Sequence, residues 1–377
     1  MTEQKVPSRI FPRAKEDAES AERVSSSPQT VSRAYKLAFQ DTDFLLREDL
    51  RPIRFQLELL KPELLLEEAG IASTFVFYGS ARIPAPDKAD ALVDAAKTDT
   101  QRAIANRLKA NSKYYDEARK LARLASATPK SSDGKKHFVV CSGGGPSIME
   151  AANRGAHDLG ADTIGLNIVL PHEQAPNDYV TPDLSFQFHY FALRKMHFLM
   201  RARAVAVFPG GFGTMDEGFE VLTLQQTGKC AIFPLVMVDA PGGDYWKTWE
   251  KFLRDHLLGR GLISEDDFSL FKVTDDIEEA VHEVKNFYRV FHSYRFVRER
   301  VVFRLQRRLS ERQLAEISAN FTDLIKTGVI EQSTALPEEQ DEASIAHLPR
   351  LVFKPNKKNY GRYREFINAI NDCDPER

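Results

Sequence analysis

The sequence has few cysteines, no long apolar run and almost no net charge, and each absence excludes a class of protein. Its three cysteines, Cys141, Cys230 and Cys373, stand far apart and form no Cys-x-x-Cys pair. This spacing argues against a disulfide scaffold or a zinc site and fits a reducing cytoplasm. No apolar stretch approaches the ~18–20 residues that span a bilayer, and the polar N-terminus shows no signal peptide. Because the net charge is only −2, we expect a cytoplasmic protein whose partner is neither nucleic acid nor a membrane.

Two common nucleotide-binding motifs are also missing. The dinucleotide fingerprint Gly-x-Gly-x-x-Gly fails after Gly143 and Gly145, where Ile148 stands at the third glycine position, and after Gly213, where Asp216 does. No Gly-Lys-Ser/Thr phosphate loop occurs, so NTP hydrolysis of that type is unsupported. The histidines form no i, i+4 pair of the kind that binds metal on a helix, and we assign no metal.

The composition is that of an ordinary globular protein. Hydrophobic residues make up 42% of the 377 residues and charged residues 28%, which is enough for a sizeable core. The first part of the chain, residues 1–30, is polar and rich in serine, and we predict a disordered tail. Residues 31–70 show a helical pattern that Pro52 and Pro62 interrupt, so we predict a helical N-terminal extension.

From residue 71 to residue 290, short apolar runs alternate with helical patterns. This alternation predicts an α/β domain with a Rossmann-like, doubly wound parallel sheet covered by helices on both faces. The remaining residues, 291–377, predict a small α+β extension. Within it we expect strands over 296–305 and 351–354 and helices over 311–326 and 360–370.

Three predicted strands of the α/β domain end in glycine-containing turns. Closely spaced glycines let backbone N–H groups approach an anion, and a following helix N-terminus adds a partial positive charge. Open parallel sheets bind ligands at the ends of their strands, so we expect one small nucleotide, such as a monophosphate. The alternative is that the glycines only make tight connections. The candidate binding residues of these turns are Gly79, Ser80, Ser142, Gly143, Gly144, Gly145, Pro209, Gly210, Gly211, Gly213 and Thr214.

Two carboxylates follow the last of these turns. Glu217 and Glu220 lie three residues apart and therefore share one face of the predicted helix. A carboxylate beside a bound sugar can stabilise an oxocarbenium-like centre or orient water, which is the chemistry of glycosidic cleavage. The alternative is that acidic side chains simply favour a helix N-terminus. The spacing alone does not decide between them.

Arg194 and Lys195 bring positive charge to a predicted helix. A planar guanidinium suits a phosphate or a leaving base, and an ammonium acts as a point charge. The alternative is a pair of solvated charges on an amphipathic helix. Glu173 lies in the polar stretch 171–177, which either lines a sugar or base pocket or forms a surface loop.

Positive charge also gathers in the C-terminal extension. Such a cluster can bind nucleic acid or an anionic effector. The interleaved Glu299 and Glu311 favour instead a solvated or subunit-contacting face. The residues are Arg295, Arg298, Arg300, Arg304, Arg307, Arg308 and Arg312.

The segments Ser142–Ala156, Arg194–Met196 and Pro209–Glu217 together resemble the Lonely Guy family of cytokinin-activating phosphoribohydrolases, which are often mislabelled lysine decarboxylases. The resemblance covers about residues 72–290. It implies a Rossmann-like enzyme that hydrolyses the N-glycosidic bond of a nucleoside 5′-monophosphate without a cofactor. It assigns catalysis to Arg194 and Glu217 and phosphate binding to Gly210, Gly211, Gly213 and Thr214.

The two extensions are similar to those of a longer bacterial group, in which AMP and related nucleotides are plausible substrates. We therefore expect an AMP nucleosidase that forms adenine and ribose 5-phosphate. One alternative is hydrolysis restricted to N6-modified adenine nucleotides, that is, cytokinin precursors. Another is a non-catalytic nucleotide or cofactor carrier. The resemblance also implies a homodimer or larger homo-oligomer, with active sites near the subunit contact.

Overall fold

The computed structural model describes residues 11–127, 134–171, 175–356 and 359–373. The chain divides into two compact units, Met1–Lys61 and Pro62–Arg377. The first unit contains the short helices α1 (Ala14–Ala21) and α2 (Thr42–Leu45) and the first turns of α3 (Arg51–Glu68). No residue of α1 is buried, so this helix has no core of its own. The stretch predicted as a disordered tail thus carries one two-turn helix, and its first ten residues lie outside the described ones.

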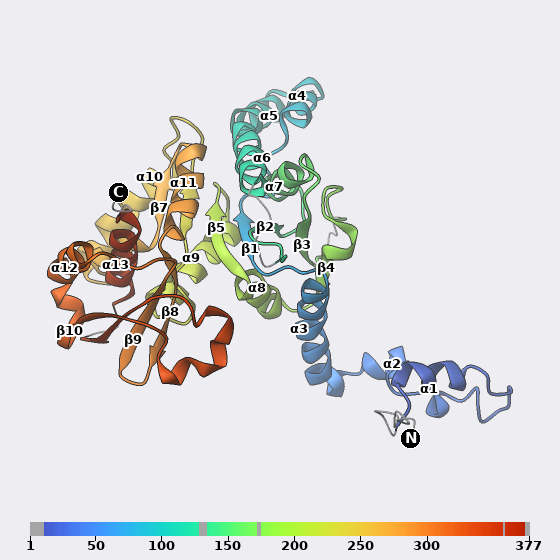
Figure 1. Ribbon diagram of the computed structural model, residues 1–377. Helices are drawn as coiled ribbons and strands as arrows, with labels where there is room; N and C mark the ends of the chain where they lie inside the picture. The colour runs from blue at the N-terminus through green and yellow to red at the C-terminus, as the bar shows by residue number, and fades with distance from the viewer. Residues whose placement is uncertain (1–10, 128–133, 172–174, 357–358, 374–377) are drawn as a thin grey trace, which may run out of the picture. The chain divides into compact units, whose positions relative to one another are not determined.

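The second unit is built on a parallel sheet, which confirms the predicted Rossmann-like α/β fold (Figure 1). Within the described residues the sheet has seven strands in the order β4-β3-β2-β1-β5-β6-β7. Strands β2 to β4 are added on one side of β1, and the chain then crosses to place β5 to β7 on its other side. The strand order therefore reverses between β1 and β5, which is the topological switch point of the sheet. The strands are β1 (Thr74–Tyr78), β2 (Val139–Ser142), β3 (Thr163–Ile168), β4 (Ser185–Phe188), β5 (Ala202–Val207), β6 (Leu235–Val238) and β7 (Lys272–Thr274).

Helices cover both faces of this sheet because its strands are apolar on both sides. Phe75, Phe77 and Ala206 pack in one cluster with α6 (Lys113–Ser126), α7 (Ile148–His157) and α11 (Ile277–Phe287). On the opposite face Tyr78 meets Phe198 of α8 edge to face, with ring centroids 5.1 Å apart. The other helices of this region are α8 (Phe191–Met200), α9 (Phe212–Gln226) and α10 (Tyr245–Phe252).

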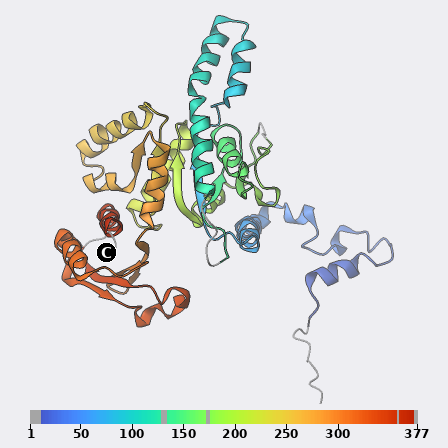
Figure 2. The same ribbon diagram turned by 45° about the horizontal axis from the view of Figure 1, so that its top comes forward.

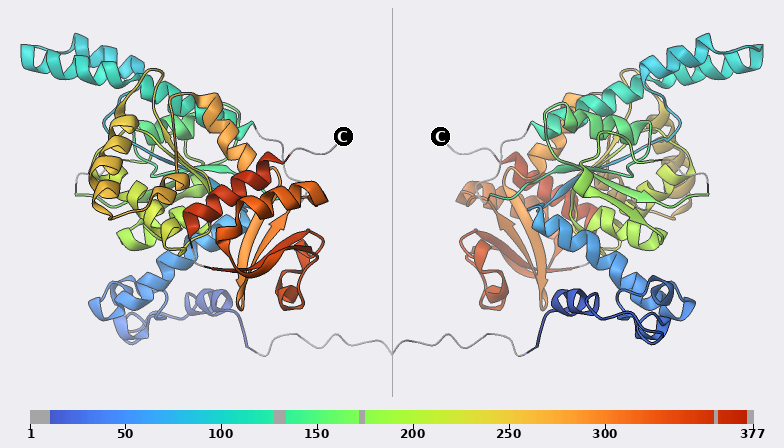
Figure 3. Two further views of the ribbon diagram at one scale, coloured as in Figure 1. Left: turned by 90° about the vertical axis from the view of Figure 1, so that its left-hand side faces the viewer. Right: turned by 90° about the vertical axis from the view of Figure 1, so that its right-hand side faces the viewer.

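A helical hairpin precedes α6. It consists of α4 (Pro86–Asp94) and α5 (Asp99–Asn111), and α5 runs into α6 at Ser112. Figures 2 and 3 show the pair projecting from the helix layer that covers the sheet. Among the described residues no helix is long and apolar enough to cross a membrane.

The C-terminal extension is α+β, as predicted, and forms an antiparallel sheet in the order β10-β11-β9-β8. The strand expected over 296–305 is a hairpin that turns at Arg298, where φ is 54°. The helix expected over 311–326 ends at Asn320, and a strand follows it. The elements are β8 (Phe291–Val297), β9 (Arg300–Leu305), α12 (Glu311–Asn320), β10 (Ile325–Ser333), β11 (Arg350–Pro355) and α13 (Tyr360–Asp372).

The extension is joined to the α/β domain by a shared core. Phe287 of α11 packs in one cluster with Phe303 and Phe366. The side-chain oxygen of Asn371 accepts hydrogen bonds from the backbone N–H groups of Val290 and Phe291, at 2.9 and 3.0 Å. The link between the two sheets is therefore packed and hydrogen-bonded.

Most of the arginine cluster is neutralised within the extension itself. Glu339 lies on the 3₁₀ segment Pro337–Ile345, is buried, and pairs with Arg304 at 2.7 Å and Arg350 at 3.1 Å. The same segment pairs with Arg295, Arg298 and Arg300. An acidic segment within the same extension thus balances these cations, which weakens the prediction of a nucleic-acid site.

Candidate active site

The site begins at the switch point of the sheet, where the loops after β1 and β5 lie side by side. The backbone N–H of Ser80 donates to the carbonyl of Pro209 at 3.1 Å, and Phe208 N–H donates to Tyr78 at 2.8 Å. Ligands of open α/β sheets bind in the crevice outside such a switch point. The pairing therefore brings the first and last predicted glycine turns together, as the sequence indicates.

Position 210 requires glycine because Thr214 and the backbone of Ser80 approach it closely. A Cβ atom built on it would lie 2.1 Å from Thr214 Oγ1 and 3.0 Å from the backbone nitrogen of Ser80. The hydroxyl of Tyr245 donates to the Gly210 carbonyl at 2.6 Å. The backbone of the turn is thereby fixed just before α9 begins, where free N–H groups and the helix dipole favour an anion.

A cavity of about 820 Å³ opens above this turn. Its volume is in the range of ordinary small-molecule sites. Its walls are largely apolar, with Phe77, Phe198 and Leu170 among them. The predicted site residues that line it are Gly79, Ser80, Gly143, Arg194, Gly210, Gly211, Gly213, Thr214 and Glu217.

Arg194 is held in one orientation from α8. Its Nε donates to the carbonyl of Leu166 at 2.7 Å, and its guanidinium lies 5.1 Å from the ring centroid of Phe198. One of its terminal nitrogens lies so close to Gly143 that a Cβ there would be 2.5 Å away. Burial lowers the pKa of Arg194, and the nearby Glu217 acts against that shift. The arginine is thus a partly desolvated cation facing the second glycine turn.

Glu217 has the properties of a proton-transfer group. Burial raises its pKa from 4.5 to about 7, and the charges of Lys195 and Arg194 limit the increase. A carboxyl group with a pKa near the working pH can both accept and return a proton. Its position on the second turn of α9 puts it directly behind the proposed anion site.

Lys195 acts electrostatically on Glu217 and is not among the residues that line the cavity. Its ammonium is 2.7 Å from Asp216 and 2.9 Å from Glu220. Glu220, which the sequence places beside Glu217 as a second carboxylate of the site, is therefore occupied by an ion pair. The structure gives Lys195 and Glu220 an electrostatic position around Glu217 rather than a place in the cavity.

Ser142, Gly144 and Gly145 are not among the residues that line the cavity, whereas Gly143 of the same turn is. Ser142 is fully buried; its hydroxyl donates to Asn153 Oδ1 at 2.7 Å and accepts from Gly144 N–H at 3.0 Å. Asn177 donates through its side chain to the carbonyls of Gly144 and Gly145, at 3.1 and 2.9 Å. These hydrogen bonds stabilise the turn, and ligand binding by these residues stays a prediction.

Pro209 does not line the cavity either, although its carbonyl pairs the two loops. Glu173 lies outside the described residues. Within the described ranges, no three His, Cys, Asp or Glu side chains gather in a way that could hold a metal ion.

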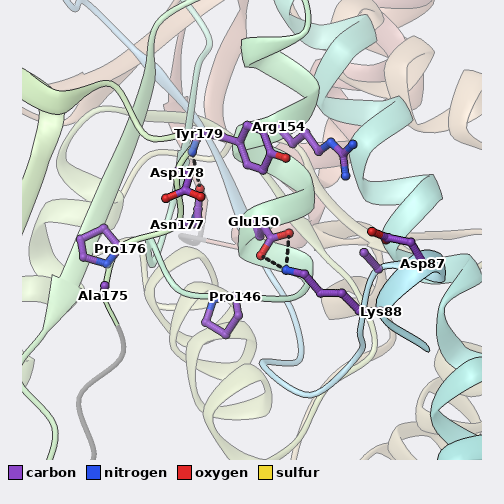
Figure 4. Close-up of a pocket in the computed structure, with 11 residues that line it drawn as sticks. Asp87, Lys88, Pro146, Glu150, Arg154, Ala175, Pro176, Asn177, Asp178 and Tyr179 are labelled. Atoms are coloured by element: carbon purple, nitrogen blue, oxygen red, sulfur yellow. Dashed lines mark hydrogen bonds and ion pairs between the residues drawn. The ribbon is translucent and has the colours of Figure 1, made fainter. Parts of the chain in front are cut away.

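A second cavity, of about 500 Å³, is lined by Pro146, Glu150 and Asn177 among others (Figure 4). Its buried carboxylate, Glu150, already pairs with Lys88 at 3.1 Å and accepts a hydrogen bond from Tyr115 at 2.8 Å. Arg154 lies 5.4 Å from the ring centroid of Tyr179. Because these charged groups are matched within the protein, the first cavity is the better candidate for the active site.

The structure adds three polar residues that sequence reasoning missed: Tyr78, Arg82 and Tyr245 all line the first cavity. Tyr78 and Arg82 lie within two residues of Gly79-Ser80 in the sequence, so their closeness to a predicted binding turn could have identified them. Tyr245 follows β6 and carries no such signal, since only the fold brings it to Gly210.

Parts of the chain are similar to known proteins. A family model described as "Possible lysine decarboxylase" matches residues 149–284. A curated "Cytokinin riboside 5′-monophosphate phosphoribohydrolase" of Mycobacterium tuberculosis (strain ATCC 25618 / H37Rv) is 29% identical over 167 residues, which cover 43% of this chain and 83% of that protein. The X-ray structure of TM1055, a structural genomics target, aligns with a TM-score of 0.33 and 19% identity over 56% of this chain and 98% of that chain. The family model and the curated relative support a similarity of the central domain to the Lonely Guy family, which carries the lysine decarboxylase label.

Proposed function

We propose that the chain hydrolyses the N-glycosidic bond of a nucleoside 5′-monophosphate and that its substrate is AMP. The observation that supports this most directly is the position of Glu217. It is a half-buried carboxyl group with a pKa of about 7, located on α9 after a glycine turn suited to phosphate. A site that only held phosphate would gain nothing from a carboxylate there, because the two negative charges repel.

The reaction follows from this arrangement. The 5′-phosphate lies on the Gly210–Thr214 turn, so the ribose faces Glu217. The bond between C1′ and N9 breaks with its electron pair going to adenine, and the carboxylate of Glu217 stabilises the positive charge that develops on the ribose. Glu217 also takes a proton from water as the water oxygen bonds to C1′, and it returns that proton to the departing adenine, so that the carboxylate is restored. Arg194 positions the nucleotide and assists departure of the base.

A second candidate substrate is an N6-modified adenine nucleotide. The curated relative is named for a cytokinin riboside 5′-monophosphate. Phe191 and Leu170 line the cavity while remaining 54% and 46% exposed. Such an apolar rim could contact an alkyl group on N6, which plain AMP lacks. A third candidate, a nucleotide carrier without catalysis, would leave the raised pKa of Glu217 without a role.

Base release separates the three candidates. The purified chain is incubated with AMP, CMP, GMP and N6-isopentenyl AMP, and free base is measured by chromatography. We expect adenine from AMP. Release from N6-isopentenyl AMP alone would make the enzyme a cytokinin-type phosphoribohydrolase, and tight binding without release from any nucleotide would leave the carrier.

Assembly as a homodimer or larger homo-oligomer belongs to the same proposal. Large apolar side chains are exposed on α8 and α9: Phe191 at 54% and Phe212 at 97%, which line the cavity, and Met196 at 50%. Grouped exposed apolar residues of this kind mark interaction surfaces. Light scattering measures the state in solution, and a strict monomer at micromolar concentration would contradict the assembly.

A further inference from the structure

Arg82 is a charged group of the cavity that neither the sequence motifs nor the mechanism above uses. It lies four residues beyond Tyr78, the last residue of β1, and is exposed to solvent. It lines the same cavity as Arg194 and Glu217. Among the described residues it forms no ion pair, whereas Lys195 and the arginines of the C-terminal extension are largely paired.

The loop that carries Arg82 is fixed against the glycine turn. Arg82 N–H donates to Ser80 Oγ at 3.0 Å, which folds the loop back on itself. Ser80 N–H in turn donates to Pro209, and the same nitrogen is 3.0 Å from the Cβ position of Gly210. The backbone of Arg82 is therefore held beside the turn that would hold the phosphate, and its side chain lines the cavity.

Binding of a phosphate at the Gly210–Thr214 turn needs more positive charge than the helix N-terminus supplies. A phosphate monoester carries about −1.5 to −2 at neutral pH, whereas a helix N-terminus supplies only about +0.5. Asp216 and Glu217 line the same cavity and repel an anion. Arg194 is held by Leu166 and Phe198 and faces Gly143. It cannot leave that position without losing these contacts.

We propose that Arg82 binds the 5′-phosphate of the substrate and makes the site specific for phosphorylated nucleosides. This inference rests on the proposed function. The planar guanidinium can donate two parallel hydrogen bonds to phosphate oxygens, which an ammonium cannot. Arg82 is thus a binding residue rather than a participant in bond cleavage, and it acts on affinity more than on the chemical step.

The test measures binding of ribose 5-phosphate to the full-length chain by calorimetry, so it needs no turnover. We expect Arg82→Gln to weaken this binding at least about tenfold and Arg82→Lys to weaken it less, because the charge is kept but the fork is lost. The melting temperature should not change. Arg102→Gln is the matched control, since Arg102 is an exposed arginine on α5 away from the cavity.

Kinetics add a second measurement on whichever nucleotide the chain hydrolyses. Arg82→Gln should raise KM about tenfold and leave kcat within about twofold. Wild-type affinity for ribose 5-phosphate in Arg82→Gln overturns the inference, as does a wild-type chain that does not bind ribose 5-phosphate. An equal loss in Arg102→Gln also overturns it. If no nucleotide is hydrolysed but Arg82→Gln still selectively loses ribose 5-phosphate, the proposed function fails and the role of Arg82 stands.

Discussion

The ammonium group of Lys195 lies 2.9 Å from the carboxylate of Glu220, one turn of α9 beyond Glu217. This ion pair joins α8 to α9, and it places a positive charge near the carboxyl group proposed to carry the chemistry. Lys195 and Arg194 both lower the pKa of Glu217, against the larger effect of burial. The basic pair of α8 therefore sets how much of Glu217 is ionised at neutral pH.

Lys195→Met should shift the pH dependence of turnover to higher pH. The proposed reaction needs the carboxylate form of Glu217, so activity rises as pH passes through its pKa of about 7. Removal of Lys195 takes away a stabilising charge and leaves Asp216 and Glu220 unpaired, which raises this pKa further. We expect the acid limb of the kcat profile to move up by roughly one pH unit.

The control for this variant is Lys120→Met, because Lys120 is also ion-paired, with Glu278 at 3.8 Å, but lies on α6. Its profile should match that of the wild type. An unchanged profile in Lys195→Met would show that a group other than Glu217 governs the acid limb.

Glu217→Gln should abolish base release while nucleotide binding persists. The amide has nearly the shape of the carboxyl group but can neither accept a proton from water nor stabilise a positive charge on the ribose. The measurements are single-turnover base release and calorimetric affinity for AMP. Loss of affinity together with turnover would instead make Glu217 a structural residue of the helix start.

The same variant should stabilise the protein in an alkaline range. Because the folded pKa of about 7 lies above the unfolded value of 4.5, the folded state binds more protons between these values, and stability falls as pH rises through that range. Glu217→Gln removes this cost, which is on the order of 2 kcal/mol at pH 8 once the partial exposure of the side chain is allowed for, and its stability should approach that of the wild type below about pH 4. Urea unfolding at both pH values measures the difference, and a constant difference would show that Glu217 is not buried as described.

The sequence predicts those parts of the fold and site that depend on local patterns. The strand, turn and helix around Gly210 and Glu217 follow one another along the chain, so the periodicity of apolar residues and the spacing of the glycines are enough to predict them. The regular alternation of strands and helices likewise predicts the parallel sheet. Contacts between distant elements are a different matter, because they depend on how each helix is rotated about its axis.

Three features could not be read from the sequence for that reason. Glu217 and Glu220 share a helix face, but only the packing of α8 against α9 shows that Lys195 forms an ion pair with Glu220. Ser142 follows an apolar run like a ligand-binding residue, yet its hydroxyl is used by Asn153. Tyr245 reaches Gly210 across 35 residues of sequence.

Gly210 and Gly213 should respond in opposite ways to substitution by alanine. At Gly210 the new methyl group would collide with Thr214 and crowd the Ser80 backbone, whereas at Gly213 nothing lies within 4 Å. We expect Gly210→Ala to lower stability by about 1–3 kcal/mol and Gly213→Ala to raise it by up to ~1 kcal/mol, because alanine is the better helix residue.

Affinity for ribose 5-phosphate should fall in both variants. In Gly213→Ala the new methyl group has no protein atom within 4 Å, so a loss of affinity would come from its contact with the bound ligand. Thermal unfolding and calorimetry measure the two quantities separately. A Gly213→Ala chain that keeps wild-type affinity would contradict phosphate binding at this turn.

Glu339→Gln should destabilise the C-terminal extension strongly. Its carboxylate is fully buried between the guanidinium groups of Arg304 and Arg350, at 2.7 and 3.1 Å. Burial alone would raise its pKa, but the N–H of Leu336 and the two arginines lower it on balance. Removal of the charge takes away the carboxylate partner of the buried Arg350, while Arg304 keeps only Glu342, and the loss of a buried partner costs about 3–5 kcal/mol.

Glu338→Gln is the matched control, because the neighbouring Glu338 pairs with Arg298 and Arg300 at 3.6 and 3.4 Å on the surface. A surface pair of this kind contributes at most about 1 kcal/mol. Urea unfolding followed by circular dichroism measures both variants. The lowered pKa of Glu339 means that its contribution is complete above the unfolded value of 4.5 and disappears as pH falls through the folded pKa. The gap between the two variants should therefore narrow in acid, and equal losses at neutral pH would show that the buried cluster is no stronger than a surface pair.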